Sequence, residues 1–301
     1  MSSSETKHIF QSLAVNVSIA VAKGIAAFFT GSGAMLAETI HSSADCANQL
    51  LLLIGVKQSA KPADEQHPLG HGRDLYFWSF IVALLLFSGG GMFSIYEGVH
   101  KFSAPEPVEH VWMGLAILVF SILMEGWATL GNLREMKERR GTTPLLQYLR
   151  NTKDSDLIVV FGENSAAVMG LTFAIASMVL SWRTGDGRWD AVGSIFIGLV
   201  LVGVAIFLAI EVKSLLIGER ADPSIEAAVQ AQVEAEPDID ALLRLISVQQ
   251  GPGEVMVAMK VKMRPGLSGE QVVESINAFE RGLRQREPHI RWCFVEPDSE
   301  A

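Results

Sequence analysis

Apolar residues dominate six stretches of the chain, and each stretch is close to the roughly 20 residues that a helix needs to cross a bilayer. Polar and charged residues gather between these stretches, so the pattern predicts six membrane-spanning helices. The predicted helices cover Ile9–Thr30, Ala34–Gln58, Leu75–Val99, Val111–Leu133, Leu157–Trp182 and Trp189–Val212.

The pattern changes from Gly218 onward, where short amphipathic segments replace the long apolar ones. Their order αββαβ, with a Gly-Pro-Gly turn between the first two strands, predicts a small ferredoxin-like α+β domain. The elements are a helix at Pro223–Glu234, strands at Ala241–Gln249 and Val255–Met263, a helix at Ser268–Arg286 and a strand at Ile290–Val295. We therefore expect a transmembrane domain at residues 1–217 and a cytoplasmic dimerisation domain at residues 218–301.

Composition and charge support this division of the 301 residues. A hydrophobic content of 49% is too high for an ordinary soluble domain, and a charged content of 19% is too high for a chain lying wholly in lipid. The net charge of -9 argues against nucleic-acid binding, because no basic face is available to neutralise phosphates. Two cysteines, Cys46 and Cys293, exclude a disulfide framework and a cysteine-rich zinc module.

Lysine and arginine decide the predicted orientation. They are enriched in the loops after the second and fourth predicted helices and sparse in the alternate loops, so the positive-inside rule places both termini in the cytoplasm. The N-terminus lacks the features of a cleaved signal or transit peptide. We therefore expect an integral protein of a bacterial inner membrane.

One face of the second predicted helix carries three ionisable residues, Glu38, His41 and Asp45, at positions i, i+3 and i+7. Ionisable side chains inside a membrane usually face the bundle interior or a water-filled path. His41 and Asp45 offer an imidazole and a carboxylate one turn apart, which suit a divalent cation such as zinc. We favour a metal site over the alternative of a buried, purely structural polar helix.

Two further polar residues, Glu163 and Asn164, interrupt the apolar run of the fifth predicted helix. Together with His41 and Asp45, Glu163 would supply three ligands, and Asn164 or a water would complete a tetrahedron around zinc. The alternative is that Glu163 pairs with a basic or hydroxyl group elsewhere in the bundle.

The loop between the second and third predicted helices brings Asp64, His67 and His71 close together in sequence, with Pro68 and Gly70 bending the chain between the histidines. The loop would hold a second divalent ion, or it would cap the third helix and use its histidines as hydrogen-bond donors. The spacing alone favours neither.

Other ionisable residues also fall in or near the apolar segments. Glu125 lies deep in the fourth helix and is either a proton carrier or pathway residue or a helix-packing group. Lys23 either offsets a neighbouring acid or extends its ammonium to an interface. Asp190 lies near the end of a helix, where an interfacial position is expected.

The run GSGAMLAETIHSSADCANQ at Gly31–Gln49 and the loop HPLGHGR at His67–Arg73 resemble motifs of the cation diffusion facilitator family of divalent-metal/proton antiporters. The predicted topology and the αββαβ tail are similar as well, so the resemblance covers nearly the whole chain. Family members commonly have His-x-x-x-Asp in the fifth helix, whereas this chain has Glu163-Asn164. In this respect it is similar to the branch that includes a mitochondrial zinc transporter of animals.

The resemblance implies a transport site containing His41 and Asp45, with Glu38 as the acidic residue three positions earlier, and a loop site at Asp64, His67 and His71. It also implies a homodimer that exports a divalent cation, Zn²⁺ or one of Mn²⁺, Fe²⁺, Co²⁺ and Cd²⁺, from the cytoplasm in exchange for protons. The sequence predicts that the chain is not an enzyme. The alternatives are a membrane-embedded zinc metalloenzyme, for which no motif is present, and a non-transporting metal sensor.

Overall fold

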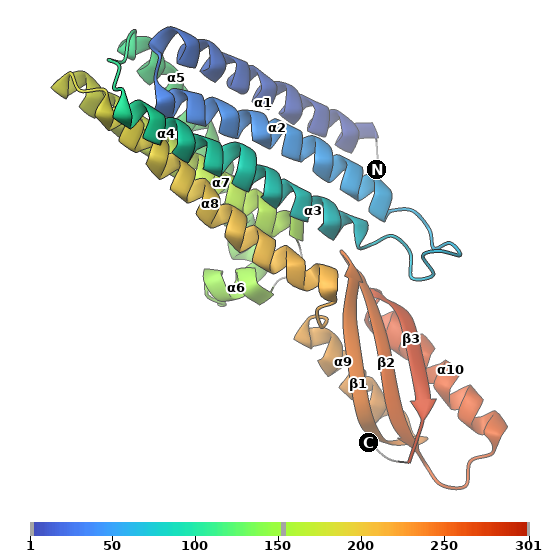
Figure 1. Cartoon of the computed structure of the whole chain (residues 1–301). Coiled ribbons are helices and arrows are strands. Elements are labelled where there is room, and N and C mark those ends of the chain that lie inside the picture. Colours follow the sequence, from blue (N-terminus) through green and yellow to red (C-terminus); the bar gives the residue numbers. More distant parts are fainter. Residues whose placement is uncertain (1–2, 152–154, 300–301) are drawn as a thin grey trace. The chain divides into compact units, whose positions relative to one another are not determined.

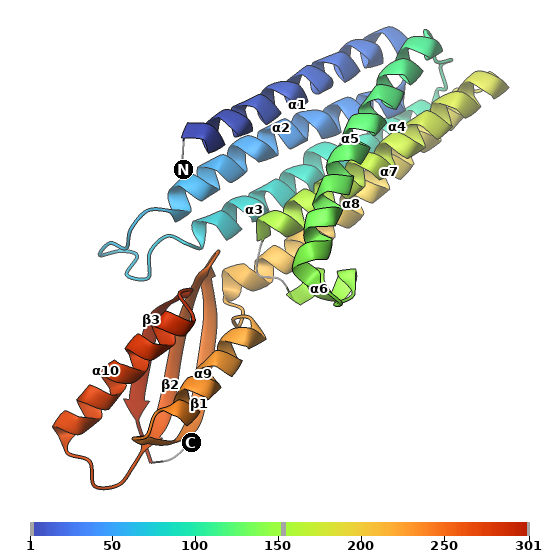
Figure 2. The ribbon, with the colours of Figure 1, turned by 180° about the vertical axis from the view of Figure 1, so that it is seen from behind.

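The computed structural model describes residues 3–151 and 155–299 (Figures 1 and 2). Long helices form the first two thirds of the chain, as predicted. Their bounds are α1 (Ser3–Thr30), α2 (Gly33–Ser59), α3 (Asp74–Leu85), the π-helical η1 (Leu86–Met92), α4 (Phe93–Ser103), α5 (Val111–Arg140), α6 (Leu145–Asn151), α7 (Ser155–Thr184) and α8 (Arg188–Ile217).

The structure confirms a helical membrane protein but not a firm count of six spans. Within the described residues, four helices are long and apolar enough to cross a membrane: Asp74–Ser103, Val111–Arg140, Val159–Thr184 and Arg188–Ile217. Helix α1 contributes a shorter apolar stretch, Asn16–Thr30. Helix α2 forms over the predicted range, but its ionisable residues lower its hydropathy, so its crossing of the membrane stays a prediction.

The long helices lie side by side in one bundle (Figures 1 and 2). Small and medium-sized apolar side chains fill its interior, among them Ala34, Met35, Leu118, Leu171 and Leu201, each at most 1% exposed. Outward-facing positions carry many large apolar residues, which suits a surface that contacts lipid rather than water.

Helices α4 and α8 approach each other closely at glycines. A Cβ on Gly98 would lie 2.8 Å from the carbonyl oxygen of Ala191, and one on Gly198 would lie 2.8 Å from that of Gly91. Between these points, the Ser194 hydroxyl donates a 2.9 Å hydrogen bond to the backbone oxygen of Ser94. The π-helical segment η1 includes Gly91, and it interrupts what the sequence predicts to be one regular helix.

The C-terminal part folds as predicted, with α9 (Pro223–Ala235), β1 (Ile239–Gly251), β2 (Glu254–Met263), α10 (Gly269–Arg286) and β3 (Ile290–Pro297). Strand β2 is central, antiparallel to β1 and parallel to β3. Both helices cover one face of the sheet (Figure 2), where residues such as Val229, Val257 and Phe279 form an apolar core. Each helix begins at a capping side chain, Asp222 for α9 and Ser268 for α10.

Contacts between residues divide the chain into two compact units. The first comprises Met1–Gly55, Trp78–Tyr148 and Asp156–Val212, and the second comprises Val56–Phe77, Leu149–Ser155 and Lys213–Ala301. The polar face of α2 up to residue 55 therefore belongs to the first unit, and the histidine-containing loop belongs to the second.

Candidate metal sites

Helix α2 is held at its start by a carboxylate from α8. Ser32 caps the helix by accepting a 3.1 Å hydrogen bond from the backbone N–H of Met35. Asp190 is only 2% exposed and accepts hydrogen bonds from the Ser32 hydroxyl and from the Gly33 N–H, each with a donor–acceptor distance of 2.5 Å. Asp190 is therefore a buried partner of the α2 N-terminus, a contact that the sequence analysis did not predict, and its position relative to the membrane interface stays a prediction.

His41 is completely buried in the middle of α2. Its Nδ1 lies 3.5 Å from Oδ1 of Asp45, one turn further along, and neither ring nitrogen has a hydrogen-bond partner. A buried imidazole without a partner is costly unless something binds it, because its desolvation is not compensated. His41 and Asp45 thus place nitrogen and oxygen atoms that could bind a metal, and that have no hydrogen-bond partner, on the same helix face, as the spacing predicts.

A cavity of about 50 Å³ lies beside this helix face. Its lining includes four polar groups predicted from the sequence, Asp45 of α2, Glu125 of α5, and Glu163 and Asn164 of α7. The other lining residues are Asn16, Ile19, Ser42, Gln49 and Ala167. The volume is sufficient for a few water molecules or a small ion, so four helices, α1, α2, α5 and α7, contribute carboxylate or amide groups to one polar space.

Asn48 is a residue of this region that the sequence analysis missed. Its Nδ2 donates a 2.6 Å hydrogen bond to Oε1 of Glu163, and the Asn48 side chain is buried. The helical spacing could have identified this residue, because Asn48 follows His41 by seven positions and Asp45 by three and so lies on the same helix face. Glu163 therefore has an amide partner rather than the basic or hydroxyl partner weighed as the alternative.

Glu38, one turn before His41, has a cationic partner from α1. Lys23 Nζ lies 3.1 Å from Glu38 Oε2, and both side chains are fully buried. The same ammonium donates a 2.8 Å hydrogen bond to the Ser42 hydroxyl. Of the two expectations for Lys23, pairing with a neighbouring acid is therefore the one that the structure confirms.

The tightest cluster of potential ligands lies in the loop between α2 and α3. Within the described part of the chain, only Asp64, His67 and His71 place three His, Cys, Asp or Glu ligand atoms within 4.8 Å of one another. His41, Asp45 and Glu163 do not form such a cluster. The loop is thus closer to a ready coordination geometry than the membrane set.

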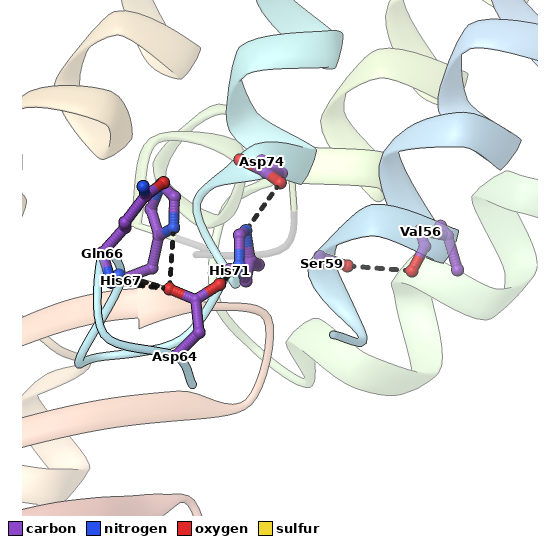
Figure 3. Close-up of polar contacts among 7 residues, drawn as sticks. All are labelled: Val56, Ser59, Asp64, Gln66, His67, His71 and Asp74. Carbon is purple, nitrogen blue, oxygen red and sulfur yellow. Dashed lines mark hydrogen bonds and ion pairs between the residues drawn. The ribbon is translucent and has the colours of Figure 1, made fainter. Parts of the chain in front are cut away.

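Figure 3 shows how the loop is organised around the Asp64 carboxylate. Oδ1 accepts hydrogen bonds from the backbone N–H groups of Gln66 (2.9 Å) and His67 (2.7 Å), and it lies 3.2 Å from Nδ1 of His67. Oδ2 lies 3.1 Å from Nε2 of His71, whose Nδ1 lies 3.3 Å from Oδ2 of Asp74 (Figure 3). The two imidazole rings lie 4.2 Å apart.

These contacts change the protonation of the loop. The hydrogen bond with His71 is the main reason that the pKa of the exposed Asp64 carboxyl is lowered, and the backbone N–H of His67 adds to the effect. The same contact with Asp64 raises the pKa of His71. The loop therefore stabilises a carboxylate beside an imidazolium, and a metal ion binding to both groups would displace the proton. Both earlier interpretations of the loop, an ion site and a cap of α3 through His71 and Asp74, are compatible with this geometry.

Comparisons with known proteins identify the family. The cation efflux transmembrane domain matches residues 9–217. The mitochondrial proton-coupled zinc antiporter SLC30A9 of Xenopus laevis is 30% identical, with 91% of this chain and 56% of the antiporter covered. The cation-efflux pump FieF of Cronobacter sakazakii is 26% identical, with 92% and 89% covered. Among solved structures, a nickel form of the MamM CTD is 15% identical, covering 26% of this chain and 99% of that chain with a TM-score of 0.25.

The chain spans about half the length of the SLC30A9 proteins that it matches, 56% for the frog protein and 42% for the mouse protein. The relatives are transporters of the cation efflux family and not enzymes, in agreement with the sequence prediction. The family match covers more than two thirds of the chain and includes the helices that carry His41, Asp45, Glu163 and Asn164. This chain is therefore a membrane protein of the cation efflux family, the cation diffusion facilitators.

Proposed function

We propose that this protein moves a divalent metal cation out of the cytoplasm in exchange for protons, by alternating access, and that Zn²⁺ is its main substrate. The observation that carries the proposal is the convergence of Asp45, Glu125, Glu163 and Asn164 on one small cavity within the bundle, beside the unpartnered His41. An imidazole with carboxylate and amide oxygens suits zinc, and the zinc antiporters among the relatives support this choice.

In this proposal His41, Asp45, Glu163 and Asn164 are the ligands of the transported ion. Because their ligand atoms do not form a compact set, binding would draw α2 and α7 closer together around the ion. Such a change of shape on binding is what alternating access requires, since the ion must stabilise one conformation more than the other.

Proton exchange follows from the chemistry of the same groups. A metal ion binds the neutral imidazole and the ionised carboxylates, so it competes with protons for them. Glu125 lines the cavity without being needed as a ligand, and we assign it the role of a proton carrier. Glu38 belongs to the same polar face, and we assign it a place along the pathway rather than in the ligand set.

The loop site at Asp64, His67 and His71 would bind a second ion of the same kind on the cytoplasmic side.

The proposal places both termini in the cytoplasm of a bacterium, the bundle in its inner membrane, and two chains paired through the tail domain. Mn²⁺, Fe²⁺, Co²⁺ and Cd²⁺ are the substrates to compare with Zn²⁺, because the same ligand types bind them with different affinities.

The second candidate is a metal sensor that binds an ion without transporting it. The compact loop cluster favours it, because the ligand atoms of Asp64, His67 and His71 already lie within 4.8 Å of one another, whereas those of the membrane set do not. A sensor would bind zinc at the loop and show no metal-dependent proton movement.

Proton flux driven by a metal gradient in proteoliposomes tests the proposal. We expect flux with Zn²⁺ in the unmodified protein, loss of flux in Asp45→Asn, and normal flux in Glu106→Gln, which neutralises an exposed carboxylate outside the cavity. Absence of flux for all five ions in protein that still binds metal would favour the sensor.

A further inference from the structure

Lys23 is the only lysine or arginine that is buried among the residues whose exposure the structure describes. Its ammonium has two partners on consecutive turns of α2, Oε2 of Glu38 at 3.1 Å and the hydroxyl of Ser42 at 2.8 Å. An ammonium has three donors and no acceptor, so Lys23 cannot be a metal ligand in this form. It is nevertheless placed directly against the helix face that carries His41.

Only one of the two carboxylate oxygens of Glu38 has a hydrogen-bond partner in this arrangement. Its Oε2 is bound by Lys23, whereas Oε1 is buried and has no hydrogen-bond partner. Oε1 faces α7 at Gly170, where a side chain would collide with it. The glycine therefore leaves space for a carboxylate oxygen that has nothing bound to it.

Glu38 and His41 would form a metal site of their own if Lys23 were absent. They lie three positions apart on one helix face, and both ring nitrogens of His41 lack hydrogen-bond partners. A carboxylate and an imidazole at this spacing are suitable zinc ligands. With Lys23 present, a divalent ion at Glu38 would lie beside a fixed positive charge and would have to displace it.

We infer that Lys23 is a positioning residue that keeps Glu38 out of the metal's ligand set. Its ammonium neutralises Glu38 and so confines the ion to His41, Asp45, Glu163 and Asn164, the ligands of the proposed transport site. The inference rests on the proposed function, because it concerns the same membrane site. It assigns to α1 a role in determining where on α2 the ion binds and how tightly it is held.

Zinc binding to the full-length chain in detergent tests the inference. Titration calorimetry is done in a His67→Ala/His71→Ala background, so that the loop does not contribute. We expect Lys23→Gln to bind Zn²⁺ about tenfold more tightly, or to bind an additional equivalent, because Glu38 becomes available. Adding Glu38→Gln to that variant should return the affinity and the stoichiometry to those of the background protein. Lys57→Gln is the matched control, because it removes an exposed lysine from the end of α2.

The reversal by Glu38→Gln distinguishes positioning from a merely structural role, because a damaged fold would bind zinc similarly with or without the Glu38 carboxylate. Equal affinity and stoichiometry in the background protein and in Lys23→Gln would overturn the inference and leave the proposed function intact. No zinc binding in the background protein would overturn both.

A second comparison applies if Lys23→Gln does not fold with its unpaired Glu38. Glu38→Gln leaves the ammonium without its carboxylate, and we expect it to weaken zinc binding by repelling the ion. Lys23→Met/Glu38→Gln removes both charges and should restore the affinity. If the double variant binds zinc no better than Glu38→Gln, the inference is wrong.

Discussion

Asn48 of α2 donates a hydrogen bond to Glu163 of α7, with 2.6 Å between Nδ2 of the amide and Oε1 of the carboxylate. The bond fixes one oxygen of Glu163 and joins α2 and α7, two of the four helices whose residues line the cavity. Partners of this kind orient a ligand, and their loss typically lowers metal affinity 10- to 100-fold.

We therefore expect Asn48→Ala to weaken zinc binding at the membrane site by a factor of roughly 10 to 100. Calorimetry in the background that lacks the loop histidines measures this effect. Asn132→Ala, a substitution of a partly exposed asparagine on α5, is the control. Unchanged zinc affinity in Asn48→Ala would indicate that Glu163 does not need this orientation, or that it is not a ligand.

Asn164 offers a neutral amide where family members commonly have an acidic ligand in the fifth helix. We expect Asn164→Asp to change the affinity for Zn²⁺ relative to Mn²⁺ and Cd²⁺, because an additional carboxylate at the cavity favours harder cations. Parallel titrations with these ions measure the shift. Identical affinities for every ion before and after the substitution would count against Asn164 as a ligand.

The loop should bind zinc more tightly as the pH rises. Asp64 raises the pKa of His71, so His71 stays protonated to a higher pH than an ordinary histidine, and zinc must displace that proton. Zinc affinity at the loop should therefore increase through this raised pKa and level off above it. Titration of an Asp45→Asn/Glu163→Gln protein at several pH values isolates the loop from the membrane site.

Asp64 also contributes to folding stability, and this contribution increases with pH, as the zinc affinity of the loop does. Its pKa is lowered in the folded chain, so its contribution is present above the pKa of the unfolded chain and is lost as the pH falls through the pKa of the folded chain.

In Asp64→Asn the rise of loop zinc affinity should shift to lower pH, because His71 loses the partner that raises its pKa. A pH profile identical to that of the unsubstituted loop would contradict the assignment of Asp64 as that partner.

Asp190→Ala should destabilise the bundle by about 2–3 kcal/mol, because it leaves the buried Ser32 hydroxyl and Gly33 N–H without their charged acceptor. Thermal unfolding in detergent measures the loss. Asp186→Ala is the comparison, since Asp186 is exposed and accepts one backbone hydrogen bond from its own loop. Equal melting temperatures for the two variants would show that the cap of α2 contributes little.

Periodicity and residue type were sufficient to predict the helices, the tail topology and the polar face of α2. The αββαβ order follows from local patterns and turn residues, which is why all five tail elements form close to their predicted bounds. Partners distant in sequence were harder to predict. Neither Asn48–Glu163 nor Asp190–Ser32 could be predicted, because each depends on which helices are neighbours and on their rotation. The π-helical segment was not predicted either, although it contains three consecutive glycines, Gly89–Gly91.

The glycine contacts between α4 and α8 restrict how the bundle can change shape. At Gly98 and Gly198 the facing main chain leaves no room for a Cβ, and the side chains of Ile195 and Ile95 pack directly against these glycines, so one helix cannot slide along the other without disturbing these contacts. The Ser194–Ser94 hydrogen bond opposes the same displacement. In the proposed transport cycle we therefore expect α4 and α8 to move together as one unit, and the motion that opens and closes the cavity to involve α1, α2, α5 and α7, the helices that line it.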